Sequence, residues 1–240
     1  RGVCDVFPRG PRGRSLAGLT RGQWIARAPR QSGVTDHRVT EALEKTPREA
    51  FAPKPFAEHA WENVELPIDC GQTMTRPVTV GVMLQALDVH REHVVLEVGS
   101  GSGYVAAVLS RLARRVYSID RYRTLVDRAR STLDFLGVSS RVEFRLADGL
   151  VGWPEAAPFD RVILMGTVTA LPEEIGRQLA VGGIVVLPVE RGGEGLILRL
   201  EKLKPLDEET DAADYGELVH NALHRFLAEI GSAWPPGAAP

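Results

Sequence analysis

The sequence has little of what covalently stapled or membrane-spanning proteins need. Only two cysteines, Cys4 and Cys70, occur among 240 residues, which excludes a disulfide framework and a thiolate metal site. Scarce cysteine is typical of proteins of the reducing cytosol, so we expect a cytoplasmic protein. No apolar run approaches the ~20 residues that a membrane-spanning helix requires, so no membrane association is expected.

A large excess of charge of either sign is also missing. The formal net charge is −2, which gives no general field to attract nucleic acid, so no nucleic-acid partner is expected. Of six histidines, His220 and His224 stand one helical turn apart, but they lack the glutamate of the zinc motif H-E-x-x-H. We therefore predict no metal site.

Composition divides the chain into three parts. Residues 1–33 hold many arginines among glycines and prolines and a single acid, which predicts a basic, disordered tail. Residues 34–204 predict one domain, with a substrate and active-site segment over 34–93 and a Rossmann-like core over 94–204. Residues 205–240 predict a linker and an amphipathic helix that packs on this domain.

Apolar runs alternate with helical patterns through the core. The runs cover residues 94–98, 116–120, 142–146 and 159–165. This alternation is typical of an α/β fold with a doubly wound, mostly parallel sheet and helices on both faces. A further helix is predicted to end at Gly182-Gly183. A last run over 196–200 is expected to pair antiparallel with its predecessor.

The glycine-rich segment after the first apolar run is the most informative feature. The run ends with Glu97-Val98, the segment G-S-G-S-G follows at 99–103, and a helical pattern begins at once. Tyr104 stands where the dinucleotide fingerprint G-x-G-x-x-G has its last glycine. The missing glycine and the preceding carboxylate favour another ligand, S-adenosylmethionine, whose ammonium group Glu97 can face.

Two more acids end the next two predicted strands. Asp120 lies about twenty residues beyond the glycine loop, where such folds place the carboxylate that accepts both ribose hydroxyls. Asp148 with Gly149 ends the third strand and suits the adenine amino group. Each acid alone is more simply a helix cap. Three acids at three successive strand ends, beside a glycine loop, predict a nucleotide-type ligand.

Four segments resemble the protein-L-isoaspartate O-methyltransferase family. In the family's order, they are V-T-D at 34–36 with P-R-E-A-F-A-P at 47–53, E-L-P-I at 65–68 with G-Q-T-M-T-R-P at 71–77, residues 97–107, and residues 148–160. The loop G-Q-T-x-[ST]-x-P is the specific element, because methyltransferases in general share the glycine loop but not this one.

The resemblance implies methyl transfer from S-adenosylmethionine to the free α-carboxylate of isoaspartyl residues in damaged peptides and proteins. S-adenosylhomocysteine is the implied product, and a monomer is expected. By position, Thr75 matches the active-site hydroxyl residue of the family, usually serine. The implied cofactor contacts are Gly99, Ser100 and Gly101 with the methionine part, Asp120 with the ribose, and Asp148 and Gly149 with the adenine.

Several departures from the family pattern leave two other functions open. Met165-Gly166-Thr167 stands in place of a T-A-A stretch, Glu190 replaces a glycine, and the C-terminal F-V-P-L segment is not recognisable. One alternative is a carboxyl methyltransferase of the same lineage that acts on aspartate in a biosynthetic peptide. The other is a non-catalytic S-adenosylmethionine-binding protein, against which the hydroxyl of Thr75 argues.

Overall fold

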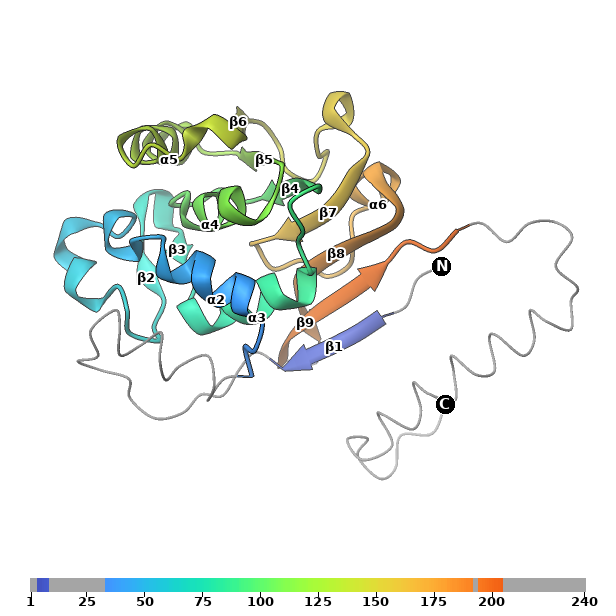
Figure 1. Cartoon of the computed structure of the whole chain (residues 1–240), viewed down its shortest axis with the longest axis horizontal. Helices are drawn as coiled ribbons and strands as arrows, with labels where there is room; N and C mark the ends of the chain where they lie inside the picture. The colour runs from blue at the N-terminus through green and yellow to red at the C-terminus, as the bar shows by residue number, and fades with distance from the viewer. Residues whose placement is uncertain (1–3, 9–32, 192–193, 205–240) are drawn as a thin grey trace, which may run out of the picture. The chain divides into compact units, whose positions relative to one another are not determined.

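The computed structural model describes residues 4–8, 33–191 and 194–204 (Figure 1). Within these residues lie a seven-stranded sheet, in the order β1-β9-β8-β7-β4-β5-β6, and a two-stranded sheet of β2 and β3. The strands are β1 Cys4–Pro8, β2 Leu66–Pro67, β3 Thr73–Met74, β4 Val94–Val98, β5 Arg115–Asp120, β6 Val142–Leu146, β7 Phe159–Leu164, β8 Leu179–Arg191 and β9 Glu194–Glu201.

The large sheet reverses its strand order at β4. Strands β8, β7, β4, β5 and β6 are parallel neighbours, and β9 is antiparallel to β8. The chain runs outward from β4 to β6 and then crosses back to β7 on the other side of β4. Such a reversal opens a crevice at the carboxyl ends of the strands, where ligands bind. The predicted doubly wound, mostly parallel sheet is confirmed, and so is the antiparallel last strand.

Helices cover the two faces of the sheet unequally. Buried residues of α2, α3, α4 and α5 pack into one core against the sheet, whereas Ile175 of α6 belongs to a second core on the other face (Figure 1). The helices of the described residues are α2 His37–Glu44, α3 Pro77–Leu87, α4 Tyr104–Leu112, α5 Arg123–Phe135 and α6 Glu173–Gln178, with 3-10 turns η1 Arg48–Ala50, η2 Lys54–His59, η3 Asp69–Gly71, η4 Ser139–Arg141 and η5 Pro154–Ala156.

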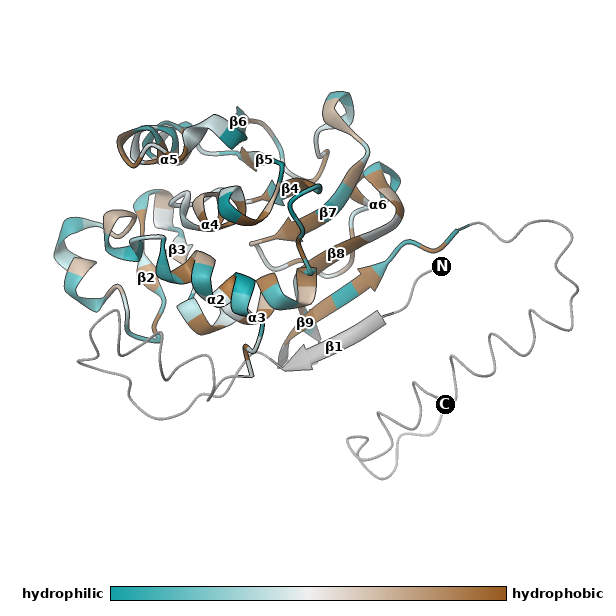
Figure 2. Ribbon diagram, in the orientation of Figure 1, coloured by the Kyte–Doolittle hydropathy of each residue, from teal (hydrophilic) through white to brown (hydrophobic). Residues whose placement is uncertain are grey.

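The central strands are apolar because both of their faces are buried. Figure 2 shows hydrophobic residues along β7 and β8. On β4, Val95 packs into the core beneath α2 to α5, and Leu96 packs into the opposite core. Successive side chains of a strand face opposite sides, so Glu97 lies on the face of Val95, the side that α4 covers. A carboxyl group therefore sits inside the larger core.

The glycine pair Gly182-Gly183 does not end a helix, contrary to the prediction. Helix α6 already ends at Gln178, and both glycines lie within β8. The pairing of β7 with β8 shifts register in this region, between Phe159 and Arg161. Gly182 has φ +73°, and a Cβ at Gly183 would approach a backbone oxygen to 2.7 Å. The pair therefore forms an irregularity inside a strand, for which glycine is as suitable as for a helix end.

Part of the segment predicted as a disordered tail is a strand. Residues 4–8 form β1, whose backbone pairs antiparallel with β9. The prediction is wrong for these residues, because the open edge of β9 offers unpaired backbone groups that composition does not reveal. Residues 9–32 and the predicted linker and helix over 205–240 lie outside the described residues and stay predictions. No helix in the described part of the chain is long and apolar enough to cross a membrane.

Candidate active site

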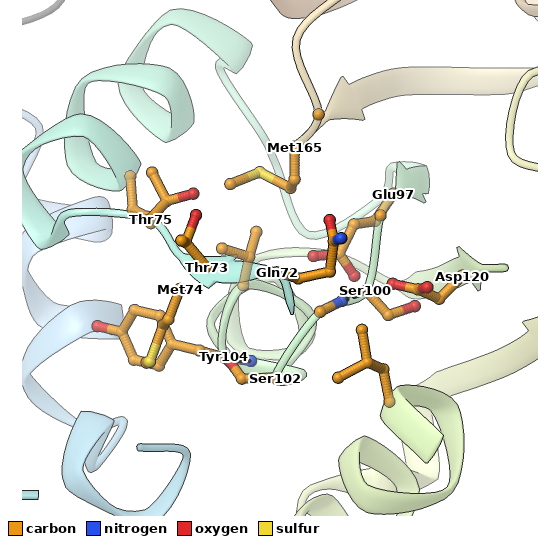
Figure 3. A pocket seen from close by; sticks show the side chains of 16 residues that line it. Gln72, Thr73, Met74, Thr75, Glu97, Ser100, Ser102, Tyr104, Asp120 and Met165 are labelled. Carbon is orange, nitrogen blue, oxygen red and sulfur yellow. Dashed lines mark hydrogen bonds between the residues drawn. The ribbon is translucent and has the colours of Figure 1, made fainter. Parts of the chain in front are cut away.

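A pocket opens at the carboxyl ends of β4 and β5, where the strand order reverses. It encloses about 580 Å³, including solvent at its mouth. Residues 72–75, which cross this edge of the sheet, line one side, and the glycine loop after β4 lines the other (Figure 3). The pocket lining includes the predicted site residues Thr75, Glu97, Gly99, Ser100, Gly101 and Asp120.

The two remaining predicted residues, Asp148 and Gly149, are not among those that line the pocket. They follow β6, the neighbour of β5, and the Asp148 side chain is exposed. Its Oδ1 accepts a hydrogen bond from the Leu150 backbone N–H at 3.0 Å. Gly149 lies against Val98, since a Cβ there would meet Val98 Cγ1 at 2.5 Å. Their assignment to the adenine edge stays a prediction.

The glycine loop turns sharply because three of its residues, Gly99, Gly101 and Gly103, have positive φ. Gly99 has φ +95° and Gly101 has φ +51°, a region in which side chains are strained. The turn lets the N–H groups of Gly99 and Ser100 both donate to the Ile119 carbonyl, at 2.8 and 3.0 Å. The loop is thereby tied to the end of β5, one residue before Asp120.

Asp120 ends β5 with its carboxylate inside the pocket lining and only 7% of the residue exposed. Its Oδ2 accepts a hydrogen bond from the Gly101 N–H at 2.9 Å, and its Oδ1 accepts one from the Tyr122 N–H at 3.0 Å. Each carboxylate oxygen has a further lone pair. Asp120 therefore both closes the glycine loop and keeps capacity for hydroxyl donors of a ligand.

Glu97 is completely buried, and one of its oxygens lacks a partner. Its Oε2 accepts a hydrogen bond from the Ser118 hydroxyl, whose Oγ lies 2.6 Å from Ser100 Oγ. Its Oε1 makes no hydrogen bond of good geometry among the described residues, and besides Ser118 the donor that approaches the carboxyl is the Ala106 backbone N–H of α4. Burial raises the pKa of Glu97 to about 8, and the nearby charge of Asp120 raises it further, whereas hydrogen bonds from the Ser118 hydroxyl and the Ala106 backbone N–H lower it. A buried acceptor without a partner calls for a donor from a ligand.

The charge of the pocket selects among ligands. Two carboxyl groups, Glu97 and Asp120, line it, and no lysine or arginine of the described residues does. A pyrophosphate would meet the charge of Asp120 and no counter-ion here, whereas an ammonium or sulfonium group is favoured by Asp120 and in turn favours the ionised form of Glu97. The residues present therefore fit S-adenosylmethionine. No cluster of three or more histidine, cysteine, aspartate or glutamate residues able to hold a metal occurs in the described ranges.

Thr75 lies on the opposite side of the pocket from Glu97 and Asp120 (Figure 3). It follows β3, which pairs with β2, and precedes α3. The N-cap of α3 is Arg76, which makes no side-chain capping bond. Thr75 is therefore not the N-cap residue of α3, and it is part of the pocket lining.

The prediction missed several pocket residues that flank the predicted ones. Gln72, Thr73 and Met165 contribute side chains to the lining, and Tyr104 follows the glycine loop. Ser118 donates a hydrogen bond to Glu97 from the neighbouring strand β5. A polar residue inside the apolar run V-Y-S-I-D was the sequence signal for Ser118. Gln72 and Thr73 stand in the G-Q-T-x-[ST]-x-P loop, so the family resemblance was the signal for them, whereas Met165 carries no pattern of its own.

The family model named Protein-L-isoaspartate(D-aspartate) O-methyltransferase (PCMT) matches residues 21–215 of this chain. The chain belongs to this family. The protein-L-isoaspartate O-methyltransferase of Maricaulis maris is 47% identical over 185 residues, which are 77% of this chain and 86% of that protein. The enzyme of that name from Cereibacter sphaeroides (strain ATCC 17029) is 46% identical over 205 residues, 85% of this chain and 91% of that protein.

Solved structures agree with the family assignment. A protein-L-isoaspartate O-methyltransferase structure, 26% identical, covers 78% of this chain and 61% of its own, with a TM-score of 0.67. A putative family member from Plasmodium falciparum, solved with S-adenosyl-L-homocysteine, is 17% identical and covers 78% of this chain and 91% of its own, with a TM-score of 0.68. The second similarity supports the fold alone. The predicted family and methyltransferase fold are confirmed.

The buried carboxyl predicts an unusual dependence of stability on pH. The folded protein keeps Glu97 protonated up to about pH 8, whereas the unfolded chain ionises it near 4.5. The unfolded state therefore gains stability as the pH rises between these values, by about 1.4 kcal/mol for each pH unit. Glu97→Gln cannot ionise, so its unfolding free energy should rise relative to the parent across this range.

Urea denaturation at pH 5, 6 and 7 measures this difference. The matched control is Glu44→Gln, which changes an exposed carboxyl on α2 and should follow the parent at each pH. A constant difference between Glu97→Gln and the parent over this range would show that Glu97 is ionised in the folded protein.

Proposed function

We propose that the chain methylates the free α-carboxylate of L-isoaspartyl residues in peptides and proteins at the pocket between residues 72–75 and the glycine loop. The activity and the methyl donor, S-adenosylmethionine, are those of its family. The acidic lining of the pocket is the observation that carries the proposal, because two carboxyl groups, one with an oxygen that makes no hydrogen bond of good geometry among the described residues, face a ligand space without a cation. A monomeric state and a cytoplasmic location stay predictions.

Each acid of the site would hold a different part of the methyl donor. Glu97 would face the ammonium group with its unpartnered oxygen, and Asp120 would accept the ribose hydroxyls. The glycine loop would surround the methionine part with main chain. Asp148 with Gly149, at the end of the next strand, would meet the adenine edge. When bound, S-adenosylmethionine supplies an electrophilic methyl group on a cationic sulfonium.

The substrate carboxylate needs no general base. It is ionised near neutral pH, and the group that departs from the methyl carbon is a neutral thioether. The protein must therefore orient the carboxylate and exclude water. Thr75 is placed for this task, since its hydroxyl can donate to a carboxylate oxygen across the pocket from Glu97. No histidine, lysine or cysteine of the described residues lines the pocket.

Two peptides that differ only in an isoaspartyl or a normal aspartyl linkage test the substrate. We expect methyl labelling of the isoaspartyl peptide alone, measured with radiolabelled S-adenosylmethionine. Equal labelling of both peptides, or labelling of the aspartyl peptide alone, would support the biosynthetic alternative. No labelling by a protein that binds S-adenosylhomocysteine would support a non-catalytic binding protein.

Exchanges at Thr75 test the catalytic role. Thr75→Val keeps the shape of the side chain without the hydroxyl, so turnover should fall by about tenfold or more while the Kd for S-adenosylhomocysteine stays within about threefold. Thr75→Ser restores the donor and should keep turnover. The matched control is Thr79→Val on α3, outside the pocket lining. Full turnover of Thr75→Val would remove Thr75 from the chemistry.

Loss of the Asp120 carboxylate should weaken the binding of S-adenosylhomocysteine. Removing a charged acceptor of buried hydroxyls costs about 1.5–3 kcal/mol, or roughly 10- to 150-fold in Kd. Calorimetry of Asp120→Ala measures this loss. The control is Asp127→Ala, which removes an exposed carboxylate from α5 and leaves the pocket lining intact. Equal Kd values for the two variants would place the ribose elsewhere.

A further inference from the structure

Arg48, in the turn η1, is completely buried. Its exposed fraction is 0%, and no carboxylate of the described residues contributes to its electrostatics. The guanidinium instead donates to two main-chain carbonyls, those of Ala60 and Thr75, the latter at 2.8 Å. Burial lowers the pKa of Arg48 to about 10, which leaves the group charged at neutral pH.

The third contact of Arg48 is aromatic. Its Cζ lies 5.7 Å from the ring centroid of Tyr104, and the Phe51 ring packs edge-on against the same ring at 5.6 Å. Tyr104 begins α4 directly after the glycine loop and lines the pocket. One buried side chain therefore contacts both the segment that carries Thr75 and the end of the glycine loop.

We propose that Arg48 is a positioning residue for methyl transfer, which fixes the Thr75 hydroxyl by holding the main-chain carbonyl of the same residue. This inference rests on the proposed role of Thr75. Before Thr75, Met74 pairs with Leu66 in the small sheet. After Thr75, the backbone enters α3 through its N-cap Arg76. The carbonyl of Thr75 precedes the helix, and the hydrogen bond from Arg48 fixes the peptide plane between these two anchors.

The chemistry of the guanidinium separates this role from simple space filling. An apolar side chain of similar length would fill the same volume without the cost of burying a charge. A planar fork with several donors can bond two carbonyls and stack on a ring at once, whereas the single ammonium of lysine cannot do all three. The two main-chain hydrogen bonds together with the contact to the Tyr104 ring therefore favour arginine over lysine at this position.

A double-mutant cycle between Arg48 and Thr75 tests the proposal. Arg48→Met should lower kcat on isoaspartyl peptide by about tenfold and leave the Kd for S-adenosylhomocysteine within about threefold. In the Thr75→Val background the same exchange should change kcat by less than about threefold, because the hydroxyl that it orients is already gone. Arg48→Lys, the milder change, should give a smaller loss of the same kind, and it replaces Arg48→Met if that variant does not fold.

Arg161 supplies the matched control. It is also a buried arginine, 8% exposed, and it donates to the carbonyls of Asp88 and Asp160 at 3.0 and 2.8 Å. Asp88 is the C-cap of α3, so Arg161 holds the far end of the helix that Thr75 precedes. Arg161→Met should lower the melting temperature and leave kcat within about twofold. In the Thr75→Val background it should change kcat by the same factor as in the parent, because the two sites are independent.

The outcomes separate this inference from the proposed function. Losses of Arg48→Met and Thr75→Val that multiply in the double variant would overturn the positioning role and leave Thr75 as proposed. Parental kcat in a folded Arg48→Met or Arg48→Lys variant would do the same. Parental kcat in Thr75→Val would overturn the proposed role of Thr75 and with it that of Arg48, because Arg48 acts through that hydroxyl. It would leave the proposed methyl transfer to isoaspartyl peptide in place.

Discussion

The structure around the pocket depends on one constraint, the burial of the Glu97 carboxyl in the middle of a parallel sheet. β4 has strands on both sides, and α4 covers the face on which Glu97 lies. Ser118 on the neighbouring strand β5 donates a hydrogen bond to one oxygen of Glu97, and the glycine loop begins two residues after Glu97. Burial without a counter-ion keeps the group protonated in the free protein. A cationic ligand favours its ionised form, so binding and protonation are linked at this residue.

Two buried ionisable groups support the pocket from different sides: Glu97 is part of its lining, and Arg48 donates to the main chain of Thr75, which lines the side across from Glu97. The carboxyl group is bonded by a hydroxyl of β5, and the guanidinium is bonded by carbonyls of the segments before α3. Neither forms an ion pair within the described residues, so each is costly for folding. Tyr104 connects the two regions, since it contacts Arg48 and starts the helix that follows the glycine loop. Burial of these two groups lowers the stability of the folded state, and in return their hydrogen bonds orient the segments around the pocket.

Much of the core could be predicted because its signals are local. The spacing of the glycines and the acids at strand ends predicted that Glu97, Ser100 and Asp120 lie in one pocket, because the carboxyl ends of parallel strands meet at one edge of the sheet. Arg48 could not be found in this way, because an arginine in a short turn is normally exposed. Strand β1 was missed because pairing with β9 depends on an edge that forms only in the folded sheet.

Thr75 and the two acids line opposite sides of the pocket. The acids that suit a cationic donor lie on the sheet side, and the hydroxyl that suits an anionic acceptor lies across from them (Figure 3). Opposite charges on donor and substrate attract one another, so the protein need not supply a base or a counter-ion for the acceptor. The remaining barrier is orientation, which short segments anchored at both ends can lower. On the proposed mechanism, the main-chain contacts of residues 72–75 therefore contribute to turnover together with the side chains that face the ligand.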